Sequence, residues 1–582
     1  MASVNRPLGT WGWNLGAASA AVQAELAAWR EQDKVRRLWA GDTSLWTRSD
    51  ENRWLGWMRL LDGADGGSNA AAPLVQLASE VVAAGFRQVV VLGMGGSSLC
   101  PEVLSQTFAP APGFPPLLVL DSTDPQQVRS LEQRLDPAHT LFLVSSKSGT
   151  TTEPHVFYEY FFARVQEAVG AERAPGHFVA ITDPGSKLQA LAERLTFRRV
   201  VPGAPDIGGR YSALSPFGMC PAALMGLDVA AILRRAAHMA RACGPEVPPE
   251  TNPGVALGIA LGTLARQGRD KLTFVASPHL ASLGGWLEQL VAESTGKNGI
   301  GIVPVDGETL GKPFVYGDDR VFVATHLAEE AGGAEAAALQ ALADAGHPVV
   351  RITMQHPLDL GQEFFRWEIA TAVAGSVLGL HPFDQPDVEA AKVATRALTA
   401  AYEKDGRLPE ENLLLEEGSL RLFAAPAHAR QLLAAAPSPG LDALLAAHLQ
   451  LLRPGDYFAL LAYLEMNAAH RRELLEIGRR VRDSKRVATT LGFGPRFLHS
   501  TGQLHKGGPN TGVFLQVTAE SKADVPIPGR PYGFGLLESF QAGGDFAVLA
   551  ERGRRVLRVH LSGDVGRSLA RLRDLVHAAV PA

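Results

Sequence analysis

The sequence predicts an α/β protein with two doubly wound parallel sheets, preceded and interrupted by helical segments. Apolar runs of four to six residues alternate with longer segments of helical periodicity, a pattern typical of strands buried on both faces of a parallel sheet. Several of these runs end in loops rich in glycine and hydroxyl side chains. Ligands bind beyond the carboxyl ends of such strands, so these loops are candidate site loops.

The 582 residues are enough for about three or four domains. Residues 1–73 are expected to be helical, 74–245 to form a first α/β domain and 250–400 a second one. A helical segment is expected at 401–483 and a C-terminal α/β segment at 484–582. The predicted strands are 88–92, 117–120, 141–144, 178–181 and 197–201, then 271–276, 321–324 and 349–353, and finally 513–517 and 556–561.

Composition excludes several classes of protein. Hydrophobic residues make up 46% and charged residues 20%, and the formal charge is −5 without a long basic run, so nucleic acid is not an expected partner. The three cysteines, Cys100, Cys220 and Cys243, cannot form a disulfide framework and indicate a reducing compartment. No signal peptide pattern or membrane-spanning apolar run is visible. We therefore expect a soluble cytoplasmic protein without a membrane partner.

The loop at 145–152 is the clearest candidate for an anion site. It follows the apolar run 141–144 and precedes a helical pattern, and it contains Lys147, Gly149 and the hydroxyl residues Ser145, Ser146, Ser148, Thr150, Thr151 and Thr152. The first N–H groups of a helix lack intrahelical acceptors and lie at its positive end, so they bind phosphate groups. An ordinary helix cap is the alternative, but one hydroxyl would be enough for a cap.

Two further loops carry candidate groups. The segment 93–98 is rich in glycine and serine, and 206–212 presents Arg210 after two glycines. Glycine lets the backbone approach a ligand closely, and an arginine held there could stabilise an oxyanion formed during a reaction. On this motif alone, pairing of Arg210 with a surface carboxylate is an equal alternative.

Two helices carry the remaining candidates of the central region. Glu293 ends the amphipathic pattern at 282–292 and precedes a glycine-containing loop. A carboxylate at the negative end of a helix is a good proton acceptor, which suits a general base, although a solvated helix-end glutamate would look the same. Lys392 lies in the first turns of the helix that opens after residues 381–387, and a solvated lysine is again the alternative.

Together these motifs resemble the phosphoglucose isomerase family. Residues 93–99 are similar to its G-x-G-G-S loop, 146–153 to its S-K-T-x-T-T-x-E phosphate loop, and 208–212 to G-G-R-[FY]-S. Residues 293–297 resemble E-S-N-G-K, and 381–392 resemble N-P-F-D-Q-x-x-V-E-x-x-K. The resemblance implies that both α/β domains are sugar-isomerase (SIS) domains.

The resemblance also implies roles in the reaction of glucose 6-phosphate to fructose 6-phosphate in glycolysis and gluconeogenesis. Glu293 would move a proton between C1 and C2 through a cis-enediol, Arg210 would stabilise the enediolate, and Lys392 would lie near the sugar ring. Gly96 and Ser97 would contact the sugar. The phosphate would be held by Ser146, Lys147, Ser148 and Thr151. No metal or other cofactor is implied, and a homodimer is expected.

One motif of the family is displaced. Its ring-opening histidine lies in a G-x-N-G-Q-H segment between the glutamate and the lysine, whereas a related segment, 500–505, follows Lys392 here. This order resembles the isomerase part of bacterial transaldolase–isomerase fusions, with the second SIS domain permuted and completed by residues 484–582. His505 is then the expected ring-opening residue, His499 the alternative, Lys506 a further contact, and transaldolase a functional partner.

Other functions remain open on the sequence. A dual phosphoglucose/phosphomannose isomerase is one, because Ser148 and Gly149 depart from the family's phosphate loop. A sugar-phosphate-binding SIS protein without catalysis is another, but it would be expected to lack Glu293 or Arg210. An aminotransferring or deaminating SIS enzyme is a third, and the sequence contains no N-terminal cysteine nucleophile of the kind such enzymes carry.

Overall fold

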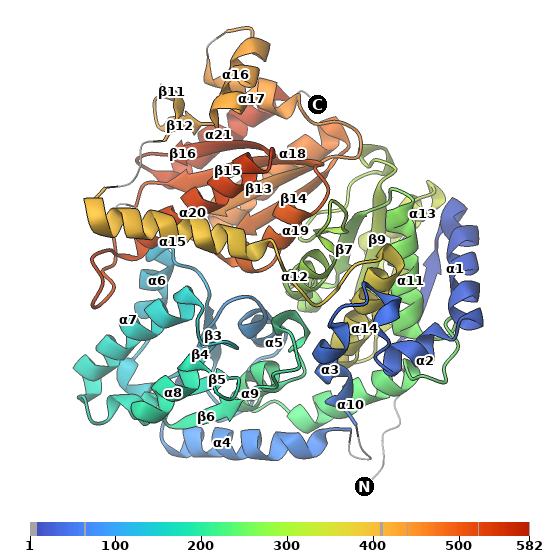
Figure 1. The fold of residues 1–582 in the computed structure, drawn as a ribbon, viewed down its shortest axis with the longest axis vertical. Coiled ribbons are helices and arrows are strands. Elements are labelled where there is room, and N and C mark those ends of the chain that lie inside the picture. Colours follow the sequence, from blue (N-terminus) through green and yellow to red (C-terminus); the bar gives the residue numbers. More distant parts are fainter. Residues whose placement is uncertain (1–7, 63–65, 408–410, 439, 522, 581–582) are drawn as a thin grey trace. The chain divides into compact units, whose positions relative to one another are not determined.

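A five-stranded parallel sheet positions the loops that the sequence singles out. In the computed structural model, which describes residues 8–62, 66–407, 411–438, 440–521 and 523–580, its strands run in the order β3-β2-β4-β5-β6 (Figure 1). The strands are β2 (Gln88–Leu92), β3 (Leu117–Leu120), β4 (Thr140–Ser145), β5 (Phe178–Thr182) and β6 (Arg199–Pro202). The order reverses between β2 and β4, which makes the sheet doubly wound.

Helices cover both faces of this sheet. The crossover from β2 through α5 (Leu99–Thr107) to β3 runs in one direction, and the crossover from β4 through α7 (Thr152–Val169) to β5 runs in the other. Because such crossovers are right-handed, α5 and α7 lie on opposite faces. α8 (Lys187–Arg194) connects β5 to β6, and α4 (Ala72–Ala83) packs against α9 (Pro216–Leu224).

The chain divides into two units, of which the first contains residues 1–121, 135–295 and 321–384. Besides the sheet above, this unit holds strands in the order β1-β10-β9-β7. Their bounds are β1 (Thr10–Asn14), β7 (Lys271–Ala276), β9 (Arg320–Leu327) and β10 (Val349–Met354). The main helices around them are α1 (Ser19–Glu31), α10 (Val229–Ala242), α11 (Pro253–Arg266), α12 (Leu283–Thr295), α13 (Gly333–Asp344) and α14 (Leu360–Leu378).

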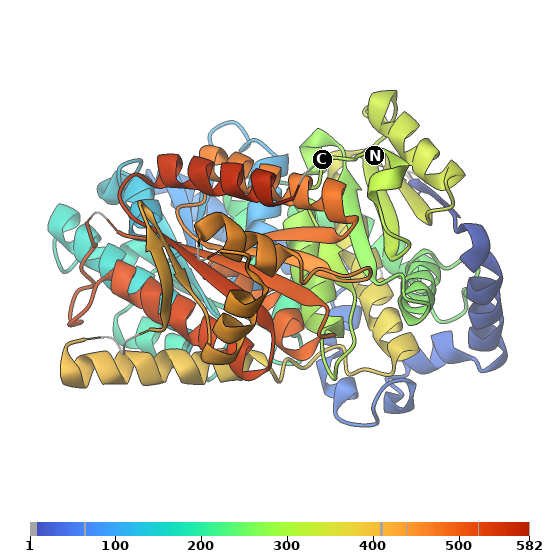
Figure 2. The ribbon, with the colours of Figure 1, turned by 90° about the horizontal axis from the view of Figure 1, so that it is seen from above.

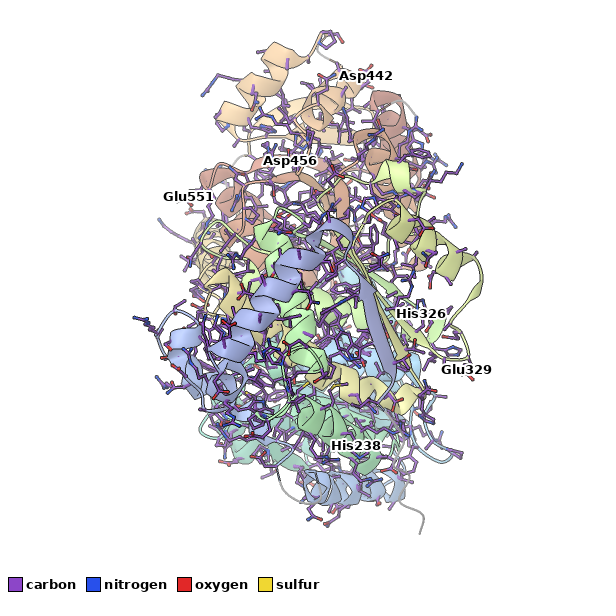
Figure 3. All side chains as sticks on the ribbon, turned by 90° about the vertical axis from the view of Figure 1, so that its right-hand side faces the viewer. His238, His326, Glu329, Asp442, Asp456 and Glu551 are labelled. Atoms are coloured by element: carbon purple, nitrogen blue, oxygen red, sulfur yellow. The ribbon has the colours of Figure 1, made fainter. Side chains whose placement is uncertain are left out.

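The second unit contains residues 122–134, 296–320 and 385–582, and its six-stranded sheet has the order β11-β12-β16-β15-β13-β14. The strands are β11 (Leu413–Glu417), β12 (Leu420–Phe423), β13 (Tyr457–Tyr463), β14 (Ala488–Phe493), β15 (Gly512–Ala519) and β16 (Arg555–Leu561). A bidentate ion pair of Arg555 with Asp456 (2.7 and 3.1 Å) ties the residue before β13 to the start of β16. Asp456 is labelled in Figure 3.

Helices cover both faces of this sheet too. α18 (Ala468–Lys485) and α21 (Val565–Ala579) pack together over one face, and α20 (Phe534–Glu551) lies on the other, beside α15 (Val388–Asp405) (Figure 2). α16 (Pro426–Ala435) and α17 (Leu441–Leu449) complete the unit, together with the short α19 (Gly502–Gly507). The residues between the sheet and α17, α18 and α21 form a continuous apolar core.

The fold class is confirmed, with three differences in detail. The described part of the segment 1–73 is mostly helical but includes β1, which pairs antiparallel with β10. The segment 401–483 is not wholly helical, because it contributes β11, β12 and β13. The strands after residue 484 pair with β13 and β12, so they build a third sheet instead of completing the second one. No helix in the described ranges is long and apolar enough to cross a bilayer.

Candidate active site

The loop between β4 and α7 forms one edge of the candidate site. β4 is buried along its whole length, and the loop leads directly into the first turn of α7. Gly149 has φ +63°, and a Cβ there would lie 2.4 Å from the backbone nitrogen of Leu188. Only glycine tolerates both conditions without strain. The first N–H groups of α7, which have no intrahelical acceptors, are thus presented by a tightly held turn.

The hydroxyl groups of this loop are not used as ordinary caps. Thr151 is the N-cap residue of α7, but its side chain makes no capping hydrogen bond. The Oγ of Ser146 is buried and has no hydrogen-bond partner among the described residues. Ser148 Oγ lies 2.8 Å from Thr150 Oγ1. Buried hydroxyl groups are normally paired, so this arrangement favours an anion site over a simple helix cap.

Lys147 behaves differently from the hydroxyl groups around it. Its Nζ pairs with the carboxylate of Asp183 and donates to the carbonyl oxygens of Ala204 (3.1 Å) and Pro205 (3.3 Å). Its charge is therefore balanced within the protein. The groups of this loop that suit an anion in the structure are the hydroxyls and the positive end of α7.

Gly96 connects the glycine loop after β2 to the loop that carries Arg210. A Cβ at Gly96 would lie 1.9 Å from the carbonyl oxygen of Gly209, so any other residue would push the two loops apart. Ser212 Oγ donates to the carbonyl oxygens of Gly209 (2.6 Å) and Gly96 (3.4 Å). Ser97, the next residue along, is buried. The two backbones are in direct contact, as close glycine packing requires.

Arg210 is almost completely buried, with 2% of its surface exposed. Its Nε donates to Ser294 Oγ (2.8 Å), and its Nη2 donates to the carbonyl oxygens of Pro382 and Asp384, both at 2.8 Å. The remaining nitrogen, Nη1, lies 3.5 Å from Oε2 of Glu293. Neutral acceptors thus fix the plane of the guanidinium, and Nη1 faces the carboxylate. The surface-pairing alternative for Arg210 does not fit this burial.

Glu293 lies in the last turn of α12, where it is 8% exposed. The amide of Gln289, one turn earlier, donates to the same Oε2 at 3.1 Å. A general base needs a fixed carboxylate near a group that can stabilise the charge formed on the substrate. Glu293 and Arg210 meet both conditions within the first unit.

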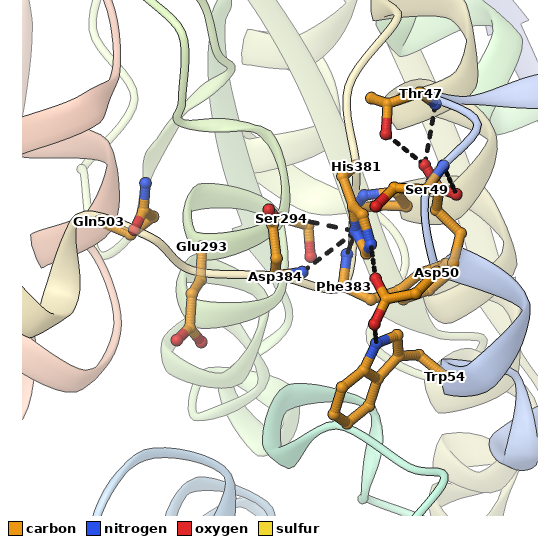
Figure 4. A network of polar contacts seen from close by, with 12 residues as sticks. Thr47, Ser49, Asp50, Trp54, Glu293, Ser294, His381, Phe383, Asp384 and Gln503 are labelled. Carbon is orange, nitrogen blue, oxygen red and sulfur yellow. Dashed lines mark hydrogen bonds and ion pairs between the residues drawn. The ribbon is translucent and has the colours of Figure 1, made fainter.

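His381 supports the turn whose carbonyl groups bind Arg210. Figure 4 shows its ring between Asp50 and the turn with Phe383 and Asp384. Nε2 of His381 lies 3.0 Å from Oδ1 of Asp50, and its Nδ1 accepts hydrogen bonds from the N–H groups of Phe383 (3.1 Å) and Asp384 (3.2 Å). The ring therefore donates to Asp50 and fixes the turn at 382–384. The hydrogen bond from His381 lowers the pKa of Asp50, which keeps this carboxylate ionised.

This supporting network is not visible in the sequence pattern. His381 stands in a recognised motif, but nothing in the letters connects it to Asp50, which lies 331 positions earlier. Ser294 follows Glu293 directly, and its contact with Arg210 likewise depends on how α12 meets the loop at 208–212. Only one feature of the sequence pointed to these two residues. His381 and Ser294 lie in the motifs at 381–392 and 293–297, which also contain the predicted site residues Lys392 and Glu293.

The other predicted residues belong to the second unit. Lys392 is exposed in the first turns of α15. His499 is half-buried at the end of a 3-10 turn, and Lys506 forms a buried ion pair with Asp545. The pairing of Lys506 leaves it no charge to offer a phosphate.

His505 is buried among aromatic rings, with its ring stacked on Tyr457 and Nδ1 3.1 Å from the tyrosine hydroxyl. Burial lowers its pKa well below the ordinary value. A residue that opens a sugar ring must reach the ring oxygen or a proton on it. This environment argues for a packing role of His505, and it leaves His499 as the accessible histidine of the pair.

The phosphoglucose isomerase family model matches residues 80–319 of the chain. The glucose-6-phosphate isomerase of Rubrobacter xylanophilus is 31% identical over 373 residues, which cover 56% of this chain and 85% of that protein. The glucose-6-phosphate isomerase of Parabacteroides distasonis is 28% identical over 411 residues, covering 61% of this chain and 89% of that protein.

Solved structures agree with these relatives. A hypothetical protein of Thermus thermophilus superposes with a TM-score of 0.56 and 26% identity, covering 67% of this chain and 99% of that one. A glucose-6-phosphate isomerase of Chlamydia trachomatis has the same fold, with a TM-score of 0.55 and 18% identity over 69% of this chain and 89% of that one. The loops of the site, the sequence relatives and the shared fold lead to one conclusion: the chain belongs to the phosphoglucose isomerase family of aldose–ketose isomerases.

Proposed function

We propose that the chain interconverts glucose 6-phosphate and fructose 6-phosphate through a cis-enediol intermediate. The observation that carries this proposal is the 3.5 Å approach of Arg210 Nη1 to Glu293 Oε2 in a buried setting. Glu293 removes the proton from C2 of the aldose or C1 of the ketose, its carboxyl group exchanges that proton with solvent at the enediol stage, and it then protonates the neighbouring carbon. The negative charge that develops on the enediol oxygen is met by Arg210.

The phosphate of the substrate is proposed to bind at the start of α7. Ser146, Ser148 and Thr151 supply hydroxyl donors there, and the helix dipole adds a positive partial charge. Gly96 and Ser97 are proposed to contact the sugar. Lys147 contributes by holding Asp183 and the carbonyl groups at 204–205, which shape the loop.

Two further roles start from the family resemblance, and the burial of His505 decides between the two histidines. Lys392 is proposed to contact the ring oxygen or hydroxyl groups of the sugar, and His499 is proposed to assist ring opening in place of His505. Lys392→Ala and His499→Ala should each lower turnover of the cyclic substrate without loss of folding. A homodimer, a cytoplasmic location, a place in glycolysis and gluconeogenesis and a link to transaldolase remain predictions.

A dual phosphoglucose/phosphomannose isomerase is the second candidate. Ser148 and Gly149 depart from the family's phosphate loop, and Gly149 places no side chain there, although its backbone is packed against Leu188. Mannose 6-phosphate differs from glucose 6-phosphate at C2, the carbon that Glu293 would deprotonate. Comparable turnover of the two aldoses would favour the dual activity.

A coupled assay with fructose 6-phosphate and purified protein tests the main proposal. We expect formation of glucose 6-phosphate, and Ser146→Ala should raise KM more than it lowers kcat, because the phosphate is bound equally in the ground and transition states. Calorimetry with fructose 6-phosphate accompanies the assay. Binding without turnover would replace the isomerase with a sugar-phosphate sensor, and absence of both would refute the site.

A further inference from the structure

The six-stranded sheet of the second unit has polar side chains on one of its covered faces. Its other face packs into the apolar core beneath α17, α18 and α21. On the face toward α20, strand pairing places one residue from each of four adjacent strands in a row: Arg421 in β12, His560 in β16, Thr518 in β15 and Tyr463 in β13. Sheets covered on both faces are normally apolar on both, so this row requires a function.

A cavity of about 780 Å³ lies over the row. Its floor is formed by the strands, one wall by Glu538 and Phe546 of α20, and the roof by Ala394, Ala397 and Leu398 of α15. Pockets of roughly 300–1,000 Å³ that combine apolar walls with a few polar groups are typical of small-molecule sites. The polar row therefore faces a cavity of suitable size.

Three polar atoms around this cavity have no partner. The hydroxyl of Tyr463, Oε1 of Glu538 and Nε of Arg421 are buried without a hydrogen bond to any described residue. Tyr463 is 2% exposed and Glu538 is 9% exposed. Buried polar groups without partners are rare in folded proteins and call for an explanation, and a bound ligand supplies one.

The position of the cavity in the sheet is the one where ligands bind in open parallel sheets. The connection from β13 through α18 to β14 runs in one direction, and that from β15 through α20 to β16 runs in the other. The order therefore reverses between β13 and β15, and ligands bind beyond the carboxyl ends of the strands at such a point. Tyr463 ends β13, and Thr518 is the penultimate residue of β15. The order β14-β13-β15-β16 repeats the order β3-β2-β4-β5 of the sheet that carries the phosphate loop.

The charges around the cavity favour an anion. Arg558 is already paired with Glu411 and donates to Gln516 Oε1 at 2.6 Å. Arg421 has no ion pair with any described residue. Burial, with Arg421 and Arg558, lowers the pKa of His560 to about 4, so this ring is neutral at pH 7.

At the end of the row opposite Arg421, the polar groups suit the base of a nucleotide, which is a neutral heterocycle. Burial raises the pKa of Glu538 well above its ordinary value, so its carboxyl group is favoured in the protonated form, which both donates and accepts hydrogen bonds. Tyr463 adds a hydroxyl at the same end. Three strand spacings of about 4.8 Å separate Tyr463 from Arg421, or about 14 Å, which is comparable to the length of an extended nucleoside monophosphate.

We propose that this cavity binds a nucleoside 5′-monophosphate. The phosphate lies at Arg421, the edge of the base meets Tyr463 and Glu538, and the flat base packs between Phe546 and the alanines of α15. The site lies outside residues 80–319, which the family model matches. Binding in this cavity does not depend on the reaction proposed above.

Calorimetry on the full chain tests the proposal, with AMP, GMP, CMP and UMP as probes and adenosine and inorganic phosphate as controls. At least one nucleotide should bind, and more tightly than either control. Arg421→Gln should weaken its binding at least tenfold and Tyr463→Phe several-fold. Ser146→Ala, which alters the phosphate loop of the first unit, should leave its affinity unchanged.

Two substitutions to phenylalanine, one that fills the cavity and one that does not, test the location of the site without changing any charge. Ala397 is exposed at the rim of the cavity, and Ala400 is an exposed residue of the same helix that does not line it. Ala397→Phe should abolish binding and Ala400→Phe should retain it, with melting temperatures close to that of the parent protein. The proposal is overturned if none of the four nucleotides binds, if Arg421→Gln and Ala397→Phe bind as the parent does, or if Ser146→Ala alone removes binding.

Discussion

Nη1 of Arg210 lies 3.5 Å from Oε2 of Glu293, and both side chains are buried in the first unit. The other guanidinium nitrogens are held by Ser294 Oγ and by the carbonyl oxygens of Pro382 and Asp384. A proton acceptor and a fixed cation therefore meet at one place. This is the pairing that abstraction of a proton next to a carbonyl group requires, because the charge left on the substrate oxygen must be stabilised as it forms.

Glu293→Gln removes the base but keeps the shape of the side chain. Turnover should fall by about 10²–10⁴-fold, the usual contribution of a positioned general base, and binding of fructose 6-phosphate should persist because the phosphate loop is untouched. Steady-state kinetics and calorimetry check the two parts. A variant with near-parental turnover would remove Glu293 from the mechanism.

Arg210→Ala should act on kcat rather than on KM. The charge that Arg210 stabilises exists only near the transition state, so a loss of about 10²–10³-fold in kcat is expected. Arg210→Lys is the matched variant, and it should recover little activity, because one ammonium cannot make the planar contacts to Ser294, Pro382 and Asp384 together. An effect confined to KM would assign Arg210 to substrate binding instead.

Asp50 and His381 act on the reaction through Arg210. Asp50→Ala frees the His381 ring and loosens the turn at 382–384, which should lower kcat roughly 10- to 100-fold through misplacement of the guanidinium, with KM little changed. Asp50→Asn keeps an oxygen that can accept from Nε2 and should retain most activity. Equal losses in both variants would indicate that the charge of Asp50, and not its hydrogen bond, is what matters.

Gly96→Ala tests the contact between the two glycine loops. The new Cβ would lie 1.9 Å from the carbonyl oxygen of Gly209, so the loop that carries Arg210 must move, and a loss of about 10²-fold in kcat is expected. Gly208→Ala is the control, because its φ of −67° is open to any residue and a Cβ there meets no atom of the described residues within 4 Å. Similar activity in the two variants would contradict the tight packing.

His448 should make the stability of the second unit depend on pH. Burial lowers its pKa from 6.5 to about 3. Between pH 6.5 and about pH 3, His448 is therefore protonated in the unfolded chain and neutral in the folded chain. The folded state therefore loses stability as the pH falls below 6.5, by about 1.4 kcal/mol per pH unit from this residue.

The variant His448→Gln isolates that contribution. It lacks the titrating group, so denaturation at pH 7.5 and at pH 4.5 should reveal a smaller acid-induced loss than in the parent protein. The histidine ring is held by Phe514 O at 3.0 Å and by His428 at 3.1 Å, and glutamine can keep the first of these contacts. Parallel curves for the two proteins would rule out His448 as a source of the pH dependence.

Much of the first unit could be predicted from local pattern. Runs such as Val89-Val90-Val91 and Leu141-Phe142-Leu143 are short, apolar and bounded by glycine or polar loops, and β2 and β4 are found there. The third sheet could not be predicted in this way. β13 is a continuous apolar run in an alanine- and leucine-rich region, and periodicity alone does not distinguish such a buried strand from a helix. Its pairing with β14 and β15 decides its conformation.

For the candidate site, too, local features could be predicted from the sequence and contacts with distant residues could not. The loops were predictable because phosphate binding and close backbone approach need particular residue types at fixed spacing. The direction of a side chain was not, since it depends on distant neighbours. Lys147 lies in the expected loop but pairs with Asp183, and His505 lies in the expected segment but is enclosed by Tyr457, Phe497 and Phe514.

Hydrogen exchange with solvent tests the central claim most directly. Fructose 6-phosphate is incubated with the purified protein in D₂O, and the glucose 6-phosphate formed is examined by NMR, with Glu293→Gln in parallel. Proton transfer by Glu293 through an enediol predicts deuterium at C2 of the product, and neither product nor exchange at an appreciable rate in the variant. Glucose 6-phosphate formed at full rate without deuterium, or deuterium incorporation that survives in Glu293→Gln, would contradict the account.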